Sequence, residues 1–338
     1  MSDLRYDPLN DQWVTIAANR RDRPMEFIPI EKAQQQLLIC PFCRGHEVET
    51  PEAIATYRPD GKLQTASDDP SNWSVRVITN KYPSFSQNGF SKKAQPFDSG
   101  PYLSNSSSGV QELIIPTPRH LTTVSQLSQH ELLMSFWVYQ QRISAHRAME
   151  GIEHSMLFLN CRSAAGASLS HLHTQLIGTP VIGGFLKGRT ERNQAYFEKH
   201  GVTLIQALMD WEIKQGRRIL EVTDNFCVVC PYASRFAFQI WIIPRNETED
   251  YATLSDHKRD ELARICQSLI GRYETIMDEP AYNLLFHFQP FAVQSGRHWY
   301  LELFPRLTRA AGFEWGTDMW VNPISPETAA GRLKVAPV

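Results

Sequence analysis

The 338-residue chain has little that would place it in a membrane or on nucleic acid. No apolar run approaches the ~18 residues of a transmembrane helix, and the amino terminus lacks the basic-then-apolar order of a signal peptide. The formal net charge is only -2, so the chain has no basic excess with which to hold nucleic acid or anionic lipid. These absences predict a cytoplasmic globular protein with no nucleic-acid or membrane partner.

Cysteine is also scarce, with six in the whole chain, four of them in two C-x-x-C pairs: Cys40 with Cys43, and Cys227 with Cys230. In a chain of this size such pairs suit a reduced compartment and a metal site better than a disulfide framework. Because 42% of the residues are hydrophobic, the chain can bury one large core or two ordinary ones.

The first cysteine pair lies in Ile39-Cys-Pro-Phe-Cys-Arg-Gly45, which has the shape of a zinc knuckle. A tight turn there lets two thiolates point at one ion about 2.3 Å away. Two further ligands are needed, and the candidates are His46, His120, His171 or the second cysteine pair. That second pair sits in an apolar, strand-like run where positions three apart face opposite sides, so we expect Cys227 and Cys230 to be core residues.

The stretch from Ser168 to Ile177 places His171, His173 and Gln175 at alternate positions of an apolar run. In a strand these three side chains share one face. An imidazole can attack phosphorus, and a neighbouring carboxamide can stabilise charge on the phosphoryl oxygens. The alternative is an edge strand with two partly exposed histidines.

Other segments have local signatures. Residues 8–11 predict a turn, followed by a short strand and a loop with three arginines in four positions, which either clamps an anion or is a solvated surface loop. Residues 86–109 are rich in Ser, Asn, Gly and Pro and predict a long loop. A helix is predicted from about 128 to 149, because Ser128 and Glu131 are spaced as a capping box before an apolar repeat.

The second half of the chain repeats the order of the first. The segments 112–116, 127–132, 155–160 and 171–176 are matched by 239–244, 254–262, 282–288 and 298–303. Pro116 precedes His171 by 55 positions, and Pro244 precedes His298 by 54. Four matching blocks in one order predict an internal duplication of a strand, helix, strand, strand unit.

The duplicated copies differ in their chemistry. Tyr300 and Glu302 stand in the second copy where the first has His173 and Gln175. The second copy therefore cannot carry the same nucleophilic chemistry.

Taken together, the motifs resemble the galactose-1-phosphate uridylyltransferase branch of the histidine triad superfamily. They follow the family's order over nearly the whole chain: Arg5-Tyr-Asp-Pro8, Arg20-x-x-Arg23-Pro24, Cys40-Pro-Phe-Cys43, Thr79-Asn80, Pro118-x-His120, Asn160, the block from Gly166 to Gln175, and Gly312-Phe-Glu314. The resemblance implies an α+β fold of two fused histidine-triad-like (HIT-like) repeats, each an antiparallel sheet with a helix. The expected boundaries are 1–180, with the knuckle and nucleophile strand, and 181–338, without the nucleophile.

The activity implied by the resemblance is nucleotidyl transfer by a ping-pong route through a histidine, as in galactose metabolism. His173 would attack the α-phosphorus of UDP-glucose or ADP-glucose, release hexose 1-phosphate, and pass the nucleotide to a sugar 1-phosphate or to phosphate. An imidazole suits this task because it is largely neutral near pH 7 and still leaves well. The family uses no organic cofactor and is usually a homodimer.

The family's functional residues carry over position by position. Gln175 and Ser168 would join His173 in the catalytic group. The substrate-binding positions are Arg20, Arg23, Asn80, Asn160 and Glu314. The zinc ligands would be Cys40, Cys43, His120 and His171, and the zinc would be structural, tying the knuckle to the nucleophile strand.

The chain departs from the family pattern at several positions. Leu172 and Thr174 stand where Pro and Gly are usual, as in relatives that act as ADP-glucose phosphorylases, and Lys81 replaces an acid. Trp320 stands where a glutamine is expected, which leaves galactose specificity open. Only His287 remains of a second metal site found in some members, so we expect that site to be lost. The alternatives to uridylyl transfer are ADP-glucose phosphorolysis and a zinc-stabilised nucleotide-binding protein without catalysis.

Overall fold

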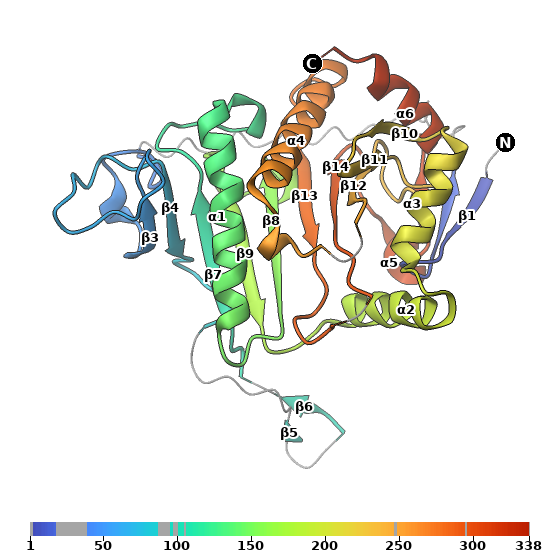
Figure 1. Ribbon diagram of the computed structural model, residues 1–338, viewed down its shortest axis with the longest axis horizontal. Coiled ribbons are helices and arrows are strands. Elements are labelled where there is room, and N and C mark those ends of the chain that lie inside the picture. The colour runs from blue at the N-terminus through green and yellow to red at the C-terminus, as the bar shows by residue number, and fades with distance from the viewer. Residues whose placement is uncertain are drawn as a thin grey trace.

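The computed structural model describes residues 3–17, 39–86, 95–96, 101–104, 106–246, 249–294 and 296–337. A single sheet of ten strands crosses the molecule, and every neighbouring pair in it is antiparallel (Figure 1). In spatial order the strands are β10 (Ile219–Val222), β11 (Phe226–Val229), β12 (Ile240–Pro244), β14 (Tyr300–Pro305), β13 (Tyr282–His287), β8 (His154–Cys161), β9 (Thr174–Thr179), β7 (Val110–Ile115), β4 (Val75–Thr79) and β3 (Ala53–Tyr57). The expected α+β class with a large antiparallel sheet is confirmed.

Two long helices, α1 (Gln129–Ala148) and α4 (Asp256–Ile276), lie side by side over the middle of the sheet (Figure 1). Helix α1 begins as predicted, since the Ser128 hydroxyl accepts from the Glu131 amide and the Glu131 carboxylate accepts from the Ser128 amide. The largest hydrophobic cluster packs between these helices and the sheet. The burial of this apolar surface is the main source of the fold's stability.

The two halves use the same pairing register. Ile114 of β7 lies opposite Thr174 of β9, and Ile242 of β12 lies opposite Leu301 of β14, which are the positions that the sequence repeat aligns. The halves meet where β8 pairs with β13. Strand, helix, strand, strand is therefore the observed order in both halves, while the boundary at residue 180, between β9 and α2, stays a prediction.

The helices α2 (Gly184–His200) and α3 (Leu204–Gln215) were among those not anticipated from the sequence. Helix α3 packs in a second hydrophobic cluster with Trp241, Ile243 and Tyr300, on the side of β12 and β14 away from α4. Helix signals were present in the sequence: the Thr203 hydroxyl caps α3, and α2 and α3 both end at glycines with positive φ.

The remaining elements flank the sheet. A three-stranded sheet consists of β1 (Asp3–Asp7), β2 (Gln12–Ile16) and β15 (Trp320–Asn322). Helices α5 (Gly312–Thr317) and α6 (Pro326–Val335) lie on either side of β15 in sequence, and β5 (Gln95–Pro96) pairs with β6 (Leu103–Ser104) within the predicted loop. Short 3-10 turns cover Glu47–Glu49, Val124–Gln126, Ser163–Ala165 and Tyr251–Thr253. Within the described ranges, no helix combines the length and apolar character that crossing a membrane requires.

Candidate functional site

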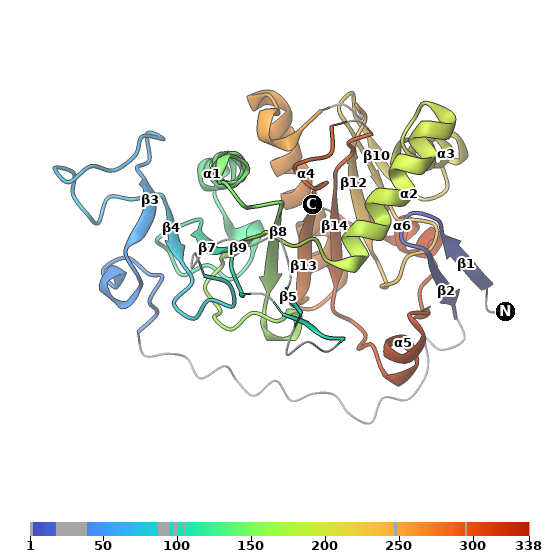
Figure 2. The same ribbon diagram turned by 90° about the horizontal axis from the view of Figure 1, so that it is seen from below.

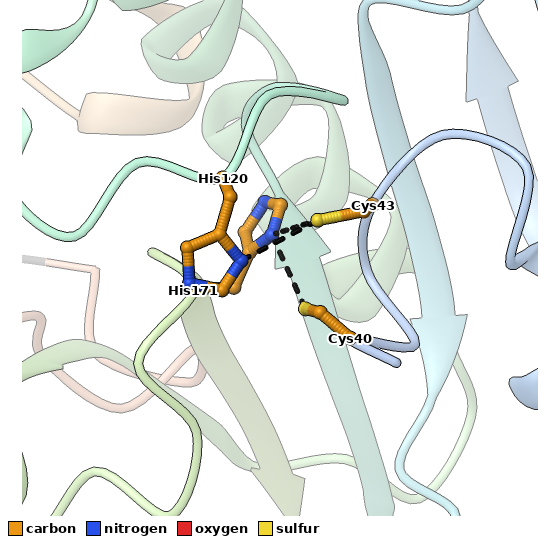
Figure 3. A group of neighbouring side chains, drawn as sticks. All are labelled: Cys40, Cys43, His120 and His171. Atoms are coloured by element: carbon orange, nitrogen blue, oxygen red, sulfur yellow. Dashed lines mark hydrogen bonds between the residues drawn. The ribbon is translucent and has the colours of Figure 1, made fainter. Parts of the chain in front are cut away.

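Two cysteines and two histidines from three separate segments converge at one point (Figure 3). Cys40 and Cys43 come from the knuckle, His120 from the turn after β7, and His171 from the segment before β9. Their ligand atoms all lie within 4.8 Å of one another. This is the ligand set that the family resemblance implies, brought together by the fold.

The spacing of the ligand atoms fits one tetrahedral ion. The Nδ1 atom of His171 is 3.6 Å from the sulfur of Cys40 and 3.6 Å from that of Cys43, and the Nδ1 atom of His120 is 3.4 Å from the Cys43 sulfur. Sulfur and nitrogen bound to zinc at about 2.3 and 2.1 Å with a tetrahedral angle lie about 3.6 Å apart. These three distances match those expected around a tetrahedral metal ion of this kind.

The outer nitrogens of both imidazoles are already engaged. His171 Nε2 donates to the Thr117 carbonyl oxygen at 3.0 Å, and His120 Nε2 lies 3.1 Å from the Ser170 hydroxyl. This arrangement leaves each Nδ1 free for an ion, as is usual for metal-binding histidines. His46, the other candidate, instead uses its Nδ1 to bond the Cys40 carbonyl at 2.9 Å and is not in the cluster.

The second cysteine pair is part of the core. Cys227 and Cys230 are both 0% exposed, and burial raises the pKa of Cys227 to about 12. The prediction that they are core residues and not ligands is confirmed.

His173 lies just before β9, which begins at Thr174. His171 and His173 therefore belong to the segment that leads into the strand and not to the strand itself. Side chains nevertheless alternate as predicted: Leu172 and Leu176 point into the main core, and Thr174 bonds the Tyr139 hydroxyl of α1 at 2.7 Å. His173 therefore faces the other side of the sheet, away from α1.

The tautomer of His173 follows from its one hydrogen bond. Its Nδ1 lies 2.8 Å from the His171 carbonyl oxygen, which can only accept, so Nδ1 carries the hydrogen and Nε2 keeps the lone pair. Burial lowers the pKa of the His173 imidazole, and the bond to the carbonyl offsets part of that effect. The side chain is therefore a neutral base at pH 7, with its nucleophilic nitrogen directed away from the backbone.

Phe42 connects the cysteine knuckle to both histidines. Its ring meets the His173 ring with centroids 5.4 Å apart at 65° and the His171 ring at 5.9 Å and 84°. It is 4% exposed and belongs to a small cluster with Trp73, Ile78, Leu113 and Ile115. The sequence analysis gave Phe42 no role, although its place between the two cysteines was a signal that it would lie near the ion.

Two carboxamides share the face of His173. Gln175 is two residues along the same strand, and its partner across the sheet is Phe158 of β8. Asn160 is two residues after Phe158, so it lies on the same face at the level of His173. Gln175 makes no side-chain hydrogen bond to another residue in the described ranges, so both of its amide hydrogens can serve a ligand.

Asn80 and Ser168 lie in two different segments, one after β4 and one in the loop before His171. Asn80 follows β4, where its amide bonds the Gln111 carbonyl at 2.9 Å and its side-chain oxygen accepts from Tyr82. Lys81, beside it, donates from Nζ to the Glu49 carbonyl oxygen at 3.3 Å. Ser168 is exposed in the loop that precedes His171.

The remaining predicted substrate contacts are Arg20, Arg23 and Glu314. Arg20 and Arg23 lie outside the described residues. Glu314 caps α5, where its carboxylate accepts from the Ala311 amide at 2.9 Å. Figures 1 and 2 agree that α5, which carries Glu314, lies apart from β9.

The equivalent position in the second half is filled by a buried ionic network. Glu302 pairs with Arg235 at 2.9 Å and accepts from His287 Nε2 at 2.7 Å, while Arg189 donates to His287 Nδ1 at 2.9 Å and to the Tyr300 hydroxyl at 3.0 Å. Arg235 is the strongest attraction that holds the pKa of Glu302 down, to about 2, against the cost of burial. On this face the side chains bind one another, and both ring nitrogens of His287 are engaged.

Comparison with known proteins gives a consistent result. A family model described as galactose-1-phosphate uridyl transferase, C-terminal domain, matches residues 189–314. The chain is 29% identical over 339 residues to ADP-glucose phosphorylase from Arabidopsis thaliana, covering 98% of this chain and 92% of the relative. It is 26% identical over 351 residues to galactose-1-phosphate uridylyltransferase from Thermotoga maritima, covering 99% and 98%.

Solved structures agree with these relatives. A crystal structure of an ADP-glucose phosphorylase from Arabidopsis thaliana with bound ADP-glucose superposes with a TM-score of 0.82 at 26% identity, covering 100% of both chains. A uridylyltransferase structure shares the fold, with a TM-score of 0.73 at 19% identity over 99% of this chain and 98% of that one. Family model, relatives and solved structures therefore agree that this chain is similar to galactose-1-phosphate uridylyltransferases and to an ADP-glucose phosphorylase.

Proposed function

We propose that this protein is a nucleotidyltransferase that moves a nucleoside monophosphate from a nucleoside-diphosphate sugar to a sugar 1-phosphate or to phosphate. The observation that carries the proposal is the state of His173, a buried neutral imidazole whose Nδ1 hydrogen is fixed on the His171 carbonyl. Such a group is a competent nucleophile at Nε2 without a separate base. The relatives bear the names of nucleotidyl-transfer enzymes, which supports the same class.

The chemistry follows in two displacements. His173 Nε2 attacks the α-phosphorus, a P–N bond forms, and the bond to the hexose 1-phosphate oxygen breaks. The positive charge that develops on the imidazole is stabilised through its Nδ1 hydrogen bond, while amide hydrogens from Gln175 and Asn160 stabilise the phosphoryl oxygens. An incoming phosphate oxygen then attacks from the opposite side, the P–N bond breaks, and the imidazole returns to its neutral state.

Uridylyl transfer to a hexose 1-phosphate is the primary candidate. Adenylyl transfer from ADP-glucose to phosphate is the second, and Lys81 favours it, because it places an ammonium group beside Asn80 where uridylyltransferases carry an acid. The similarity to a structure that holds ADP-glucose supports the same candidate.

The metal at the cysteine and histidine cluster is proposed to be Zn²⁺ with a structural role. Cys40, Cys43, His120 and His171 would complete its four positions and leave none for a substrate, which is the pattern of structural zinc sites. The ion would fix the knuckle, and with it Phe42, against the segment that carries His173.

The two halves are proposed to be HIT-like repeats, and the whole to act as a homodimer. The repeat assignment is supported by the shared element order and register. The dimer is supported by the position of α5, which carries Glu314 and lies apart from β9 in both views (Figures 1 and 2), so that a second copy of the chain would supply the Glu314 that contacts the hexose.

Intact-mass measurement tests the function directly. The purified protein is incubated separately with UDP-glucose and with ADP-glucose, and His173→Ala is compared with the exposed-site control His130→Ala. Gain of one UMP identifies uridylyl transfer, and gain of one AMP identifies the phosphorylase. Labelling that survives in His173→Ala would reject the nucleophile, and no gain with either sugar would leave the non-catalytic binding protein.

A further inference from the structure

Asn283 is a buried asparagine from the second half of the chain that contacts the candidate site of the first half. It lies on β13 directly opposite Asn160 of β8 and is 8% exposed. Its Nδ2 atom donates to Asn160 Oδ1 at 2.8 Å and to the Ala165 carbonyl oxygen at 2.9 Å. Both hydrogens of this amide nitrogen are therefore used.

These two bonds fix the orientation of both carboxamides. A backbone carbonyl oxygen only accepts, so the group of Asn283 that faces Ala165 must be the nitrogen. That nitrogen also faces Asn160 and requires an acceptor there, so Asn160 must present Oδ1 to it. The Nδ2 group of Asn160 is consequently turned away from Asn283.

The released donor lies where the reaction takes place. Asn160 is half-buried and sits on the face of His173, and its Nδ2 donates to no residue within the described ranges. A Cβ atom added at Gly166 would lie only 3.5 Å from this nitrogen, so the glycine leaves space beside it. Two hydrogens of Asn160 thus stay available to an anion bound on this face of the sheet.

We propose that Asn283 is a positioning residue for the transfer reaction, which holds Asn160 with its amide hydrogens toward the phosphoryl group attacked by His173. This inference rests on the proposed function. It assigns a task in the active site of the first half to a side chain of the second half, and no motif in the sequence marked that side chain.

A double-mutant cycle tests the inference. The rate of nucleotidyl-enzyme formation in a single turnover is measured for wild type, Asn283→Leu, Asn160→Ala and the double variant. Leucine keeps the branched shape and the number of heavy atoms of the asparagine side chain and removes its donors. Because hydrogen bonds to charged groups are the stronger class, we expect Asn283→Leu to slow labelling by about tenfold or more. In the Asn160→Ala background, Asn283→Leu should slow labelling by only about twofold or less, because the Asn160 side chain through which Asn283 acts is already absent.

Gln140→Met is the matched control. Gln140 is another buried carboxamide that donates to two backbone carbonyls, those of Tyr251 and Leu254, but it lies on α1. Its replacement should lower thermal stability and leave the labelling rate unchanged. Asn283→Ser provides a second variant if leucine prevents folding.

Three results would overturn the proposal. A wild-type rate in the folded Asn283 variants would show that Asn283 does not act in the reaction. An equal loss in both backgrounds would show that it acts by some route other than Asn160. A wild-type protein that is not labelled by either nucleotide sugar would reject the proposed function itself, an outcome distinct from the first two.

Discussion

Replacement of Phe42 should separate the packing role of the knuckle from its role in holding the nucleophile. The ring is 4% exposed and touches the rings of His171 and His173 edge to face. Truncation of a buried phenylalanine to alanine costs about 3–5 kcal/mol of unfolding free energy. Each of the two ring contacts adds about 0.5–1.5 kcal/mol beyond burial, so about 1–3 kcal/mol of that total depends on the aromatic ring itself.

These magnitudes predict different outcomes for two variants. Phe42→Ala should lose about 3–5 kcal/mol of stability, because burial and ring contacts are both removed. Phe42→Leu keeps most of the apolar volume and should lose about 1–3 kcal/mol. Since His173 is then held by one fewer ring, nucleotidyl labelling in Phe42→Leu should slow by roughly tenfold, equivalent to about 1.4 kcal/mol.

Urea unfolding and single-turnover labelling measure the two effects on the same samples. Phe286→Leu is the control, because Phe286 is 1% exposed and packs against Phe136 and Tyr139 at 6.0 Å on the opposite face of the sheet. It should lose stability and keep its labelling rate. If Phe42→Leu matched wild type in both measurements, the ring contacts would contribute nothing and the reasoning would be refuted.

Two further predictions concern the metal and pH. Cys40→Ser should lower the bound zinc and the melting temperature more than the labelling rate, and atomic absorption and calorimetry measure the first two. Cys266→Ser, a change in the core, should keep the metal. Unchanged zinc content in Cys40→Ser would contradict the proposed site. Burial, followed by the charge of Arg189, lowers the pKa of His287 to about 4, and its Nδ1 already accepts from Arg189. Between pH 6.5 and about 4, His287 is therefore protonated in the unfolded chain but not in the folded chain. The free energy of unfolding is consequently at its full value near pH 7 and falls as the pH is lowered through this range. Urea unfolding at pH 7 and pH 5 should show a smaller pH effect in His287→Gln, and an equal effect would reject this assignment.

Elements with strong local signals could be predicted from the sequence. The capping box at Ser128 located the start of α1, and four matching blocks gave the repeated order that the sheet shows. Helix α2 was missed because its buried side chains are Arg189, Thr190 and Asn193, so apolar periodicity, the usual helix signal, is weak there.

Some residues of the candidate site could also be predicted from their neighbours in the sequence, whereas others could be found only in the folded chain. Alternation along one segment was enough to place His173 and Gln175 on a common face, and it held although β9 begins only at Thr174. The sequence pattern alone could not choose between His120 and His46 as the metal ligand, because His46 lies close to Cys43 and His120 lies in a turn. That choice depended on the family resemblance. Phe42 and Asn283 required the folded chain, since each acts on residues more than a hundred positions away.

The seam between β8 and β13 also has consequences for how the chain folds. Phe158 and Leu285, which the sequence repeat aligns, pair with each other across it, so the seam is a local twofold axis within one chain. Its contacts are long-range, with Asn160 and Asn283 separated by 123 positions, and such pairings form slowly because a large loop must close first. Until they form, each half exposes an unpaired strand edge that can add a strand from another molecule. A ribosome that has completed only the first half has therefore made all four residues of the cysteine and histidine cluster and the proposed nucleophile His173, but on a sheet whose open edge favours aggregation until the second half is made.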